Sequence, residues 1–243
     1  MIDAEVRPVP LGTRLLDCDV PLTQQALSEA WEDGWRGIIR YVGFGVKPWP
    51  GDLTLKERDL ILGFQPRVVG AAGFGLMVVQ HPRTALWTPT DAWGRSDGDA
   101  AVTQALGAGY LPGSTLWNDI EGVSEGATDA IISHANIKHA VVSEGHFEPG
   151  EYIGDRCRMS STQLFRALLS SLYWKSGSAV PDVERRGYCM VQTIPSKQNP
   201  IVYGGIDFDW NLHGGDRMGG VAHWTIAASA PKPPPPPTSL DAA

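Results

Sequence analysis

The order of apolar and polar positions along the chain predicts short strands that alternate with helices. Five polar or charged stretches carry apolar residues at helical spacing, and the first follows Thr23, a residue suited to cap a helix. Expected helices cover 22–32, 54–62, 97–107, 128–141 and 161–170. Expected strands cover 14–17, 37–42, 75–80, 115–120, 152–154, 172–174, 189–192 and 202–208.

This alternation is typical of a parallel sheet with helices outside it. Eight strands in one domain favour a closed α/β barrel of the (β/α)8 TIM type, regular or irregular, over an open sheet. We therefore predict an irregular lead-in over residues 1–12, a barrel domain over 13–228 and a proline-rich tail over 229–243. Consecutive prolines in that tail favour an extended spacer, which is either a linker or a docking peptide for another protein.

Composition narrows the possible partners. The 243 residues carry a net charge of −7 and no Lys/Arg cluster, so we expect no nucleic-acid partner. No run of 18 apolar residues predicts a membrane span, and the N-terminus lacks the apolar segment of a signal peptide. Synthesis in the cytoplasm is therefore expected. The three cysteines form no CxxC pair, and we expect them to be buried or half-buried free thiols.

The segment TLWNDIEG, residues 115–122, is the most informative. Asp119 and Glu121 are two positions apart, so on a strand both point to one side, with Cα atoms roughly 6–7 Å apart. The carboxyl end of a barrel strand is where barrel active sites lie. Two close carboxylates raise one pKa, which supplies the proton donor that glycosidic bond cleavage requires.

Two other predicted strands also end in acids. LLDCDV places Asp17 and Asp19 on a common side, and GGIDFDWN does the same for Asp207 and Asp209. A barrel brings its first, fourth and eighth strand ends to one rim. Strand parity alone does not decide between Asp207 and Asp209.

Four stretches together resemble the glycoside-hydrolase-like barrels related to family 25 lysozymes, including the Asp-rich domain found in actinobacterial secreted proteins and phage lysins. The stretches are LLDCDVPLTQQALSEAWEDGWRGIIRYVG, DAAVTQALGAGYLPGSTLWNDIEG, GYCMVQTI and GGIDFDWN. The resemblance covers residues 12–228. It departs from the family-25 pattern at Asp17-Cys18-Asp19, where Asp-x-Ser is usual, and in an insert, WTPTDAWGRSDG, that we expect at the rim.

The resemblance implies hydrolysis of the β-1,4 bond after N-acetylmuramic acid in peptidoglycan, without a cofactor. It makes Glu121 the general acid, and Asp119 the residue that orients the substrate acetamido group or stabilises positive charge. Asp17 and Asp209 would position water or bind hydroxyls, and the D-x-N pattern prefers Asp209 over Asp207. Further residues expected to line the sugar cleft are Asp207, Asp19, Arg40, Trp117, Tyr152, Trp174 and Gln192. The protein would act at the cell wall, delivered by lysis machinery or as a virion component.

Three alternatives stay open. Gly122–Gly126 fits the G-x-S-x-G elbow, so Ser124 with Asp207 and His213 or His223 would make a serine esterase. A non-catalytic barrel for glycan binding or virion architecture fits the same fold. The acids could also hold a hard cation, but no DxDxDG or HExxH motif is present, and we expect no metal.

Overall fold

The structure is a computed structural model that describes residues 1–45, 47–65 and 73–228. The predicted tail, 229–243, lies outside the described residues. The strands are β1 (Ala4–Pro8), β2 (Arg14–Asp17), β3 (Gly37–Val42), β4 (Gly75–Gln80), β5 (Thr115–Ile120), β6 (Glu148–Ile153), β7 (Tyr173–Lys175), β8 (Met190–Thr193), β9 (Ile201–Tyr203), β10 (Ile206–His213) and β11 (His223–Ala227). The helices are α1 (Gln24–Glu32), α2 (Leu55–Leu62), α3 (Asp91–Gly107), α4 (Thr128–Glu144) and α5 (Ser161–Arg166).

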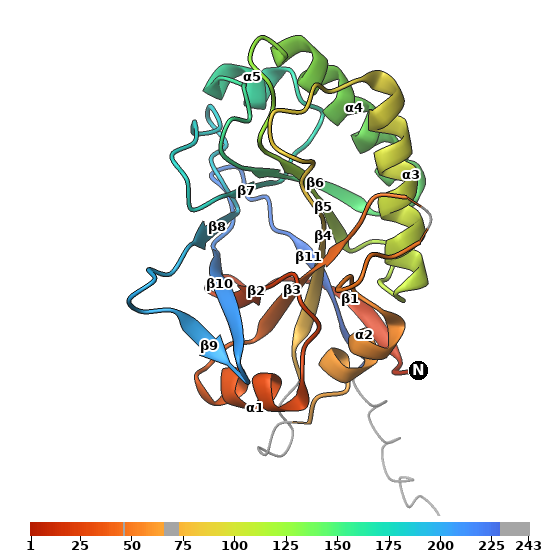
Figure 1. Ribbon diagram of the computed structural model, residues 1–243, viewed down its shortest axis with the longest axis vertical. Helices are drawn as coiled ribbons and strands as arrows, with labels where there is room; N and C mark the ends of the chain where they lie inside the picture. Colours follow the sequence, from red (N-terminus) through yellow and green to blue (C-terminus); the bar gives the residue numbers. More distant parts are fainter. Residues whose placement is uncertain (46, 66–72, 229–243) are drawn as a thin grey trace, which may run out of the picture.

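Eight strands close into a barrel, as predicted (Figure 1). Strands β2 to β8 pair in chain order and run parallel. The eighth strand, β10, pairs antiparallel with both β8 and β2 and so closes the ring. The barrel is therefore of the TIM type with one reversed strand, and this reversal brings the start of β10, not its end, to the mouth.

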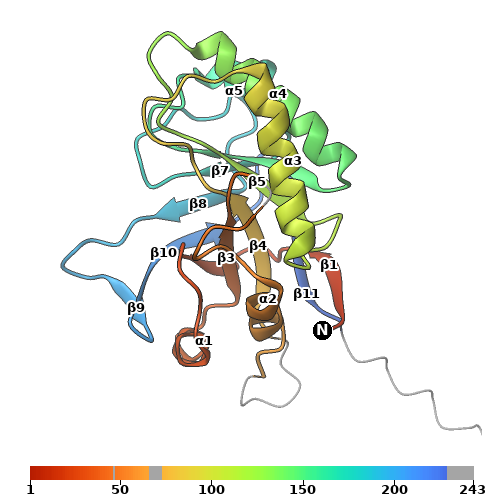
Figure 2. The same ribbon diagram turned by 45° about the vertical axis from the view of Figure 1, so that its right-hand side comes forward.

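The helices do not alternate regularly with the strands. Helices α3 and α4 lie side by side along one flank of the barrel (Figures 1 and 2). Within the described ranges, loops rather than helices follow β7 and β8. No helix of the part that the structure describes combines the length and the apolar character needed to cross a membrane. All three cysteines are free and buried, as expected.

Strand alternation divides the core into three layers. Inward-facing residues such as Leu15, Met77, Trp117 and Trp174 fill the barrel. Outward-facing residues of the same strands pack against α1, α2 and α3 on one side and against α4 and α5 on the other. Buried side chains thus fill the interior of the barrel below its mouth.

The predicted irregular lead-in is wrong for part of its length. Residues 4–8 form β1, which pairs antiparallel with β11, a strand that the sequence pattern did not predict. Trp224 of β11 packs inside the barrel against the first residues of β3 and β4. The β1–β11 pair therefore closes the end of the barrel opposite the mouth.

Two further predictions required correction. The expected strand over 202–208 is a hairpin, because Gly204 and Gly205 have φ of 56° and 78° and turn the chain between β9 and β10. The helix expected to begin at residue 97 begins at Asp91, after Thr90, so most of the insert WTPTDAWGRSDG, residues 87–98, belongs to α3. The Thr90 hydroxyl accepts a hydrogen bond from the Trp93 amide and so caps the helix.

Candidate active site

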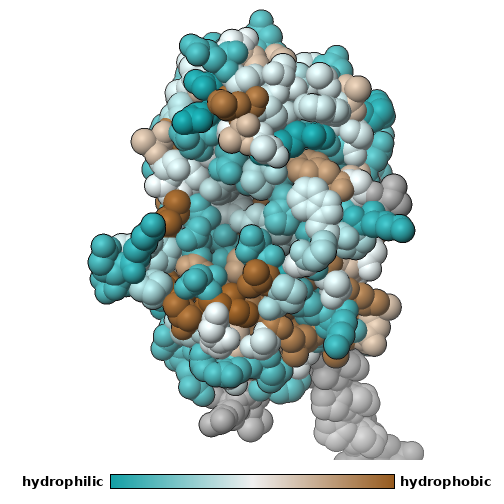
Figure 3. All heavy atoms as spheres, viewed as in Figure 1, coloured by the Kyte–Doolittle hydropathy of each residue, from teal (hydrophilic) through white to brown (hydrophobic). Residues whose placement is uncertain are grey.

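A cleft of about 770 Å³ opens at the mouth of the barrel. Figure 3 shows a hollow near the centre of this face, with hydrophilic side chains inside it. Six carboxylates line the cleft: Asp17, Asp19, Asp119, Glu121, Asp207 and Asp209. The rim acids predicted from three strand ends therefore do meet, and both Asp207 and Asp209 face the cleft.

Asp119 is the last but one residue of β5, and Glu121 directly follows the strand. Gly150 of β6 and Gly154, which directly follows β6, make room for the inward side chains of the β5 segment. A Cβ on Gly154 would lie 2.5 Å from both Cβ and Oε2 of Glu121, and one on Gly150 would lie 2.5 Å from Cε3 of Trp117. Glycine at these positions allows Glu121 to lie close against β6, above the buried Trp117.

Asp17 forms the floor of the cleft. It is 4% exposed and accepts hydrogen bonds from Asn211 Nδ2 at 2.6 Å and from the Tyr41 hydroxyl at 3.1 Å. Gln192 Nε2 lies 3.3 Å from Asp17 Oδ2 and 3.4 Å from Asp209 Oδ2. Three side-chain amide and hydroxyl donors thus hold a buried carboxylate in place, which offsets the cost of burying it.

A second layer of side chains holds these donors. The Tyr152 hydroxyl donates to Gln192 Oε1 at 2.8 Å, and Trp174 Nε1 donates to Asn211 Oδ1 at 2.8 Å. Trp174 is fully buried, so it supports the floor through Asn211 and does not line the cleft. Tyr152 and Gln192 do line it, as the sequence predicted.

The cleft favours protonated carboxyl groups. Burial and the nearby Glu121 raise the pKa of Asp119 well above its usual value. Burial, and to a lesser degree Asp155, raise the pKa of Glu121. Burial also raises the pKa of Asp17, and burial with the Asp17 charge raises that of Asp209 to about 6. Protons are therefore held in the cleft at pH values where exposed carboxyl groups have lost them.

Asp119 has one oxygen without a partner. Its Oδ1 is shielded from solvent and receives no hydrogen bond in the described structure. Buried polar atoms are nearly always paired, and exceptions concentrate where a ligand or a reaction partner completes the set. Asp119 is thus poised to receive a donor or a positive charge from a bound molecule.

Arg40 and Trp117 were expected to line the cleft, and the structure places both elsewhere. Arg40 points out of the barrel, because its neighbours in the strand, Ile39 and Tyr41, point in. It is fully buried, and its Nε donates to Glu57 Oε1 at 2.7 Å. Trp117 points inward but lies one layer below Asp119, with no exposed surface.

Several cleft residues were not predicted. Tyr41 and His81 come from the ends of β3 and β4, and the loop between β8 and β9 adds Lys197. Tyr41 carried a usable signal, since it is the inward neighbour of Arg40 at a strand end. No sequence signal pointed to Lys197, because the path of its loop depends on β10, whose reversed direction the sequence pattern does not reveal.

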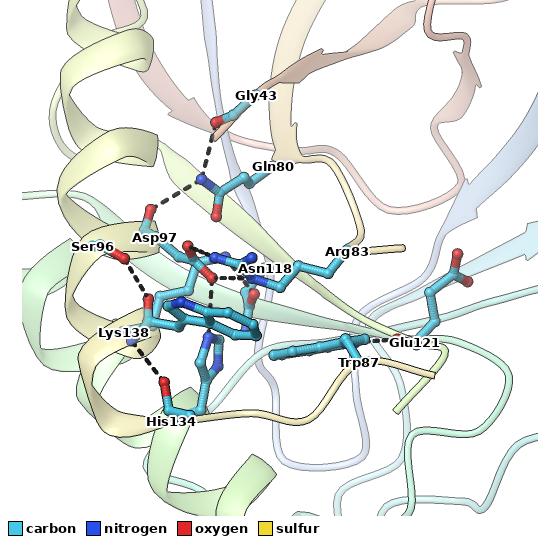
Figure 4. Close-up of polar contacts among 12 residues, drawn as sticks. Gly43, Gln80, Arg83, Trp87, Ser96, Asp97, Asn118, Glu121, His134 and Lys138 are labelled. Carbon is cyan, nitrogen blue, oxygen red and sulfur yellow. Dashed lines mark hydrogen bonds and ion pairs between the residues drawn. The ribbon is translucent and has the colours of Figure 1, made fainter. Parts of the chain in front are cut away.

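The backbone of Glu121 is held by the segment that follows β4 (Figure 4). Trp87 Nε1 donates to the Glu121 carbonyl oxygen at 2.9 Å. The Arg83 guanidinium, close to the Trp87 ring, donates to both carboxylate oxygens of Asp97, at 2.9 and 2.5 Å. His134 Nε2 lies 3.1 Å from the same carboxylate. A buried polar layer behind β5 therefore fixes the position of the predicted acid.

The serine-esterase alternative is contradicted by the geometry. Ser124 follows the carboxyl end of β5, and its hydroxyl lies 3.0 Å from that of Thr88. His213 pairs with the first residue of β8, and the His223 amide donates to the side chain of Thr115, the first residue of β5. Both histidines are thus at the opposite end of the barrel, and no Ser–His pair forms. Among the described residues, no group of three or more His, Cys, Asp or Glu side chains is arranged to hold a metal ion.

Residues 18–210 match the Rv2525c-like, glycoside hydrolase-like domain. The chain belongs to this family. Rv2525c itself, a Tat-secreted protein of Mycobacterium tuberculosis crystallised with L-tartrate, has a TM-score of 0.61 at 18% identity, over 86% of this chain and 100% of that one. This family assignment confirms the resemblance found in the sequence.

Members of the lysozyme group share the fold. A family 25 glycosyl hydrolase from Bacillus anthracis has a TM-score of 0.53 at 10% identity, over 86% of this chain and 91% of that one. A lysozyme from Streptomyces coelicolor has a TM-score of 0.50 at 14% identity, over 85% of this chain and 94% of that one. No functionally curated protein shows a significant match in sequence.

Proposed function

We propose that this protein is a peptidoglycan glycoside hydrolase of the N-acetylmuramidase type, with Glu121 as general acid and Asp119 as assisting carboxylate. The observation that carries the proposal is the pair itself. Two carboxyl groups lie at one strand end in the mouth of a glycoside-hydrolase-like barrel, and both have raised pKa values. Proton transfer to a leaving sugar needs a carboxylic acid that remains protonated near neutral pH.

Each step of glycosidic bond hydrolysis can then be assigned to a residue of the cleft. The Glu121 carboxyl proton passes to the glycosidic oxygen, the bond from that oxygen to the anomeric carbon breaks, and the leaving sugar departs as an alcohol. Positive charge develops at the anomeric carbon, and Asp119 or the substrate acetamido oxygen stabilises it. Water then adds to the anomeric carbon and gives a proton back to the Glu121 carboxylate.

The two carboxyl groups are assigned different roles because they lie at different depths in the cleft. Glu121 lies just beyond the last residue of β5 and is half-buried, so its longer side chain reaches a bond in the cleft. Asp119 lies deeper and retains the unpaired Oδ1. Its pKa is raised well above its usual value, and that of Glu121 is raised as well, so the two groups share protons as a pair. A developing cation, or an acetamide N–H donated to Oδ1, favours the ionised form of Asp119 and leaves the proton on Glu121.

The other acids form the sugar-binding floor. Asp17 and Asp209 share the Gln192 amide and are cross-strand partners, so a hydroxyl group or the attacking water can bridge them. Asp19 and Asp207 are exposed at the rim, where they would accept hydrogen bonds from outer sugars. Tyr152 also lines the cleft, and its hydroxyl donates to Gln192, the residue whose amide Asp17 and Asp209 share.

The comparisons support the substrate class because lysozymes and a family 25 glycosyl hydrolase share the fold. Cell-wall glycan is accordingly the proposed partner. Delivery as a phage lysin or a virion component stays a prediction from the sequence, as does a protein partner for the proline-rich tail.

Release of reducing ends from purified peptidoglycan tests the proposal. We expect Glu121→Gln to lower the rate by about 10²–10⁴-fold, the usual contribution of general acid catalysis. Glu125→Gln, an exposed acid four residues further on, should leave the rate unchanged. Folded wild-type protein that releases no ends from several wall types would instead favour a non-catalytic glycan-binding or virion structural barrel.

An aryl glycoside separates the two carboxyl roles. A phenolate leaving group needs little protonation, so Glu121→Gln should regain most of its rate on the aryl substrate. Asp119→Asn should stay impaired on both substrates, because charge still develops at the anomeric carbon. The opposite pattern would exchange the roles of the two residues.

A further inference from the structure

A column of three aromatic rings rises from the cleft floor along one wall. Tyr41, whose hydroxyl donates to Asp17, lies with its ring centroid 4.8 Å from that of His81. Trp49 stacks on His81 at 5.4 Å with an interplanar angle of 28°. Tyr41 and His81 line the cleft, and Trp49 ends the column with 45% of its surface exposed.

The loop that carries Trp49 is held in place by buried polar groups. Asp52 is 2% exposed, and its carboxylate accepts the Trp49 amide at 2.6 Å and contacts His81 Nε2 at 3.0 Å. The buried Arg40 donates to the carbonyl oxygen of Gly51 at 2.6 Å and also to that of Cys18. One arginine therefore ties the Trp49 loop to the loop that follows β2, which is the other edge of this wall.

Few tryptophans of the described structure are as exposed as Trp49. Trp117 and Trp174 are fully buried, and Trp93, which is exposed to a similar extent, is covered by the Arg83 guanidinium at 4.1 Å. Over the described ranges no Lys or Arg side chain lies over the Trp49 ring. Its ring packs against His81 and, at a tilt, against Phe44 with a centroid distance of 5.8 Å, and the remaining part of the indole is exposed.

We propose that Trp49 is the stacking platform of a further glycan subsite, which binds an uncharged pyranose ring at the outer end of the cleft. The C–H groups of a pyranose face pack on an aromatic ring as other apolar groups do. A fixed ring loses little entropy on binding, which strengthens such a contact. Six carboxylates in the adjoining cleft favour an uncharged sugar over an anionic one at this position.

This proposal rests on the proposed function for the nature of the ligand, and binding can be measured without turnover. The probe is a set of soluble, peptide-free peptidoglycan strands, long enough to fill the cleft, together with their disaccharide unit. Titration calorimetry is carried out in the Glu121→Gln background. We expect Trp49→Ala to weaken the Kd for long strands about tenfold, which equals about 1.4 kcal/mol, and to leave disaccharide binding unchanged.

Two matched variants make the test specific. Trp49→Phe retains a ring and should retain most of the affinity, and Trp93→Ala, which removes a similarly exposed indole that packs beside Trp87 and not on the cleft residue His81, should retain all of it. Thermal unfolding of each variant confirms that it is folded. The inference is overturned if Trp49→Ala binds long strands as tightly as its parent, or if Trp93→Ala weakens binding equally.

The two proposals fail in different ways. Suppose that binding of glycan strands depends on Trp49 but the wild-type protein cleaves no cell wall. The proposed hydrolase function would then be rejected, and the proposed subsite would stand. Suppose instead that the wild type cleaves long glycan strands and that Trp49→Ala changes neither the cleavage rate nor the Kd. The hydrolase function would then stand, and the proposed subsite would be rejected. Absence of any strand binding by the Glu121→Gln protein would remove the subsite outright.

Discussion

Gly154→Ala directly perturbs the position of Glu121. The added Cβ would lie 2.5 Å from Cβ and Oε2 of Glu121 and 3.2 Å from Cε1 of Tyr152. Carbon atoms in contact normally lie about 3.5–4.0 Å apart, so Glu121 must move by about 1 Å. The φ of Gly154 lies outside the left-handed region, so the backbone itself accepts alanine and the effect comes from this contact.

A displacement of about 1 Å at a catalytic group can lower a rate by about 10²-fold, and overpacking of this kind costs about 1–3 kcal/mol of stability. We therefore expect kcat for release of reducing ends to fall by about two orders of magnitude while the protein stays folded. Initial rates and thermal unfolding should be measured on the same samples, below the unfolding transition.

Gly150→Ala is the matched control. Gly150 lies in β6, four residues before Gly154, and its Cβ would meet Trp117 at 2.5 Å, one layer below the acids. It should lower stability by a similar amount, with a much smaller effect on kcat. A wild-type rate for Gly154→Ala would refute the argument, and so would equal rate losses in the two folded variants.

Three further predictions concern the groups around the cleft. Asn211→Ala removes the closest donor to Asp17 and leaves Trp174 Nε1 unpaired, so urea unfolding should show a loss of about 1–3 kcal/mol for each buried group. Because the pKa of Asp209 is raised from 3.8 to about 6, the folded state retains a proton that the unfolded chain releases. Stability should therefore fall as the pH rises from about 4 to about 6, and Asp209→Asn should flatten this dependence in urea unfolding at several pH values. Asp97→Ala removes the partner of two basic side chains behind β5 and should cost about 3–5 kcal/mol, checked by the same method.

The sequence predicted those parts of the fold that local pattern controls. The bounds of β2, β3, β4 and β5 agree with the expected strands, because these strands are buried apolar runs between clear turn or capping residues. The strands β1 and β11 were missed, since both are mixed in polarity and are defined mainly by pairing with each other. The reversed β10 was also missed, because nothing in the alternation of residues encodes strand direction.

The site was predictable to a similar extent. Asp119 and Glu121 both line the cleft, as expected, because two acids spaced i, i+2 at a strand end share one face, and that rule is local. Arg40 was misplaced because a strand end alone does not say which face a residue occupies. Trp49 was not identified, because its contact with His81 joins loops after different strands and arises only when the barrel closes.

The reversed closing strand also affects how the protein acquires its site during folding. Asp17 and Asp209 are direct cross-strand partners, although they are separated by most of the chain. Pairs so distant in sequence form late, because the entropy of closing a long loop must be overcome before their contacts stabilise anything. The parallel units from β2 to β8 can assemble as the chain emerges from the ribosome, whereas the seam between β2 and β10 cannot. A nascent chain therefore has the β5 acids early but lacks the complete cleft until β10 has been made and has paired with β2.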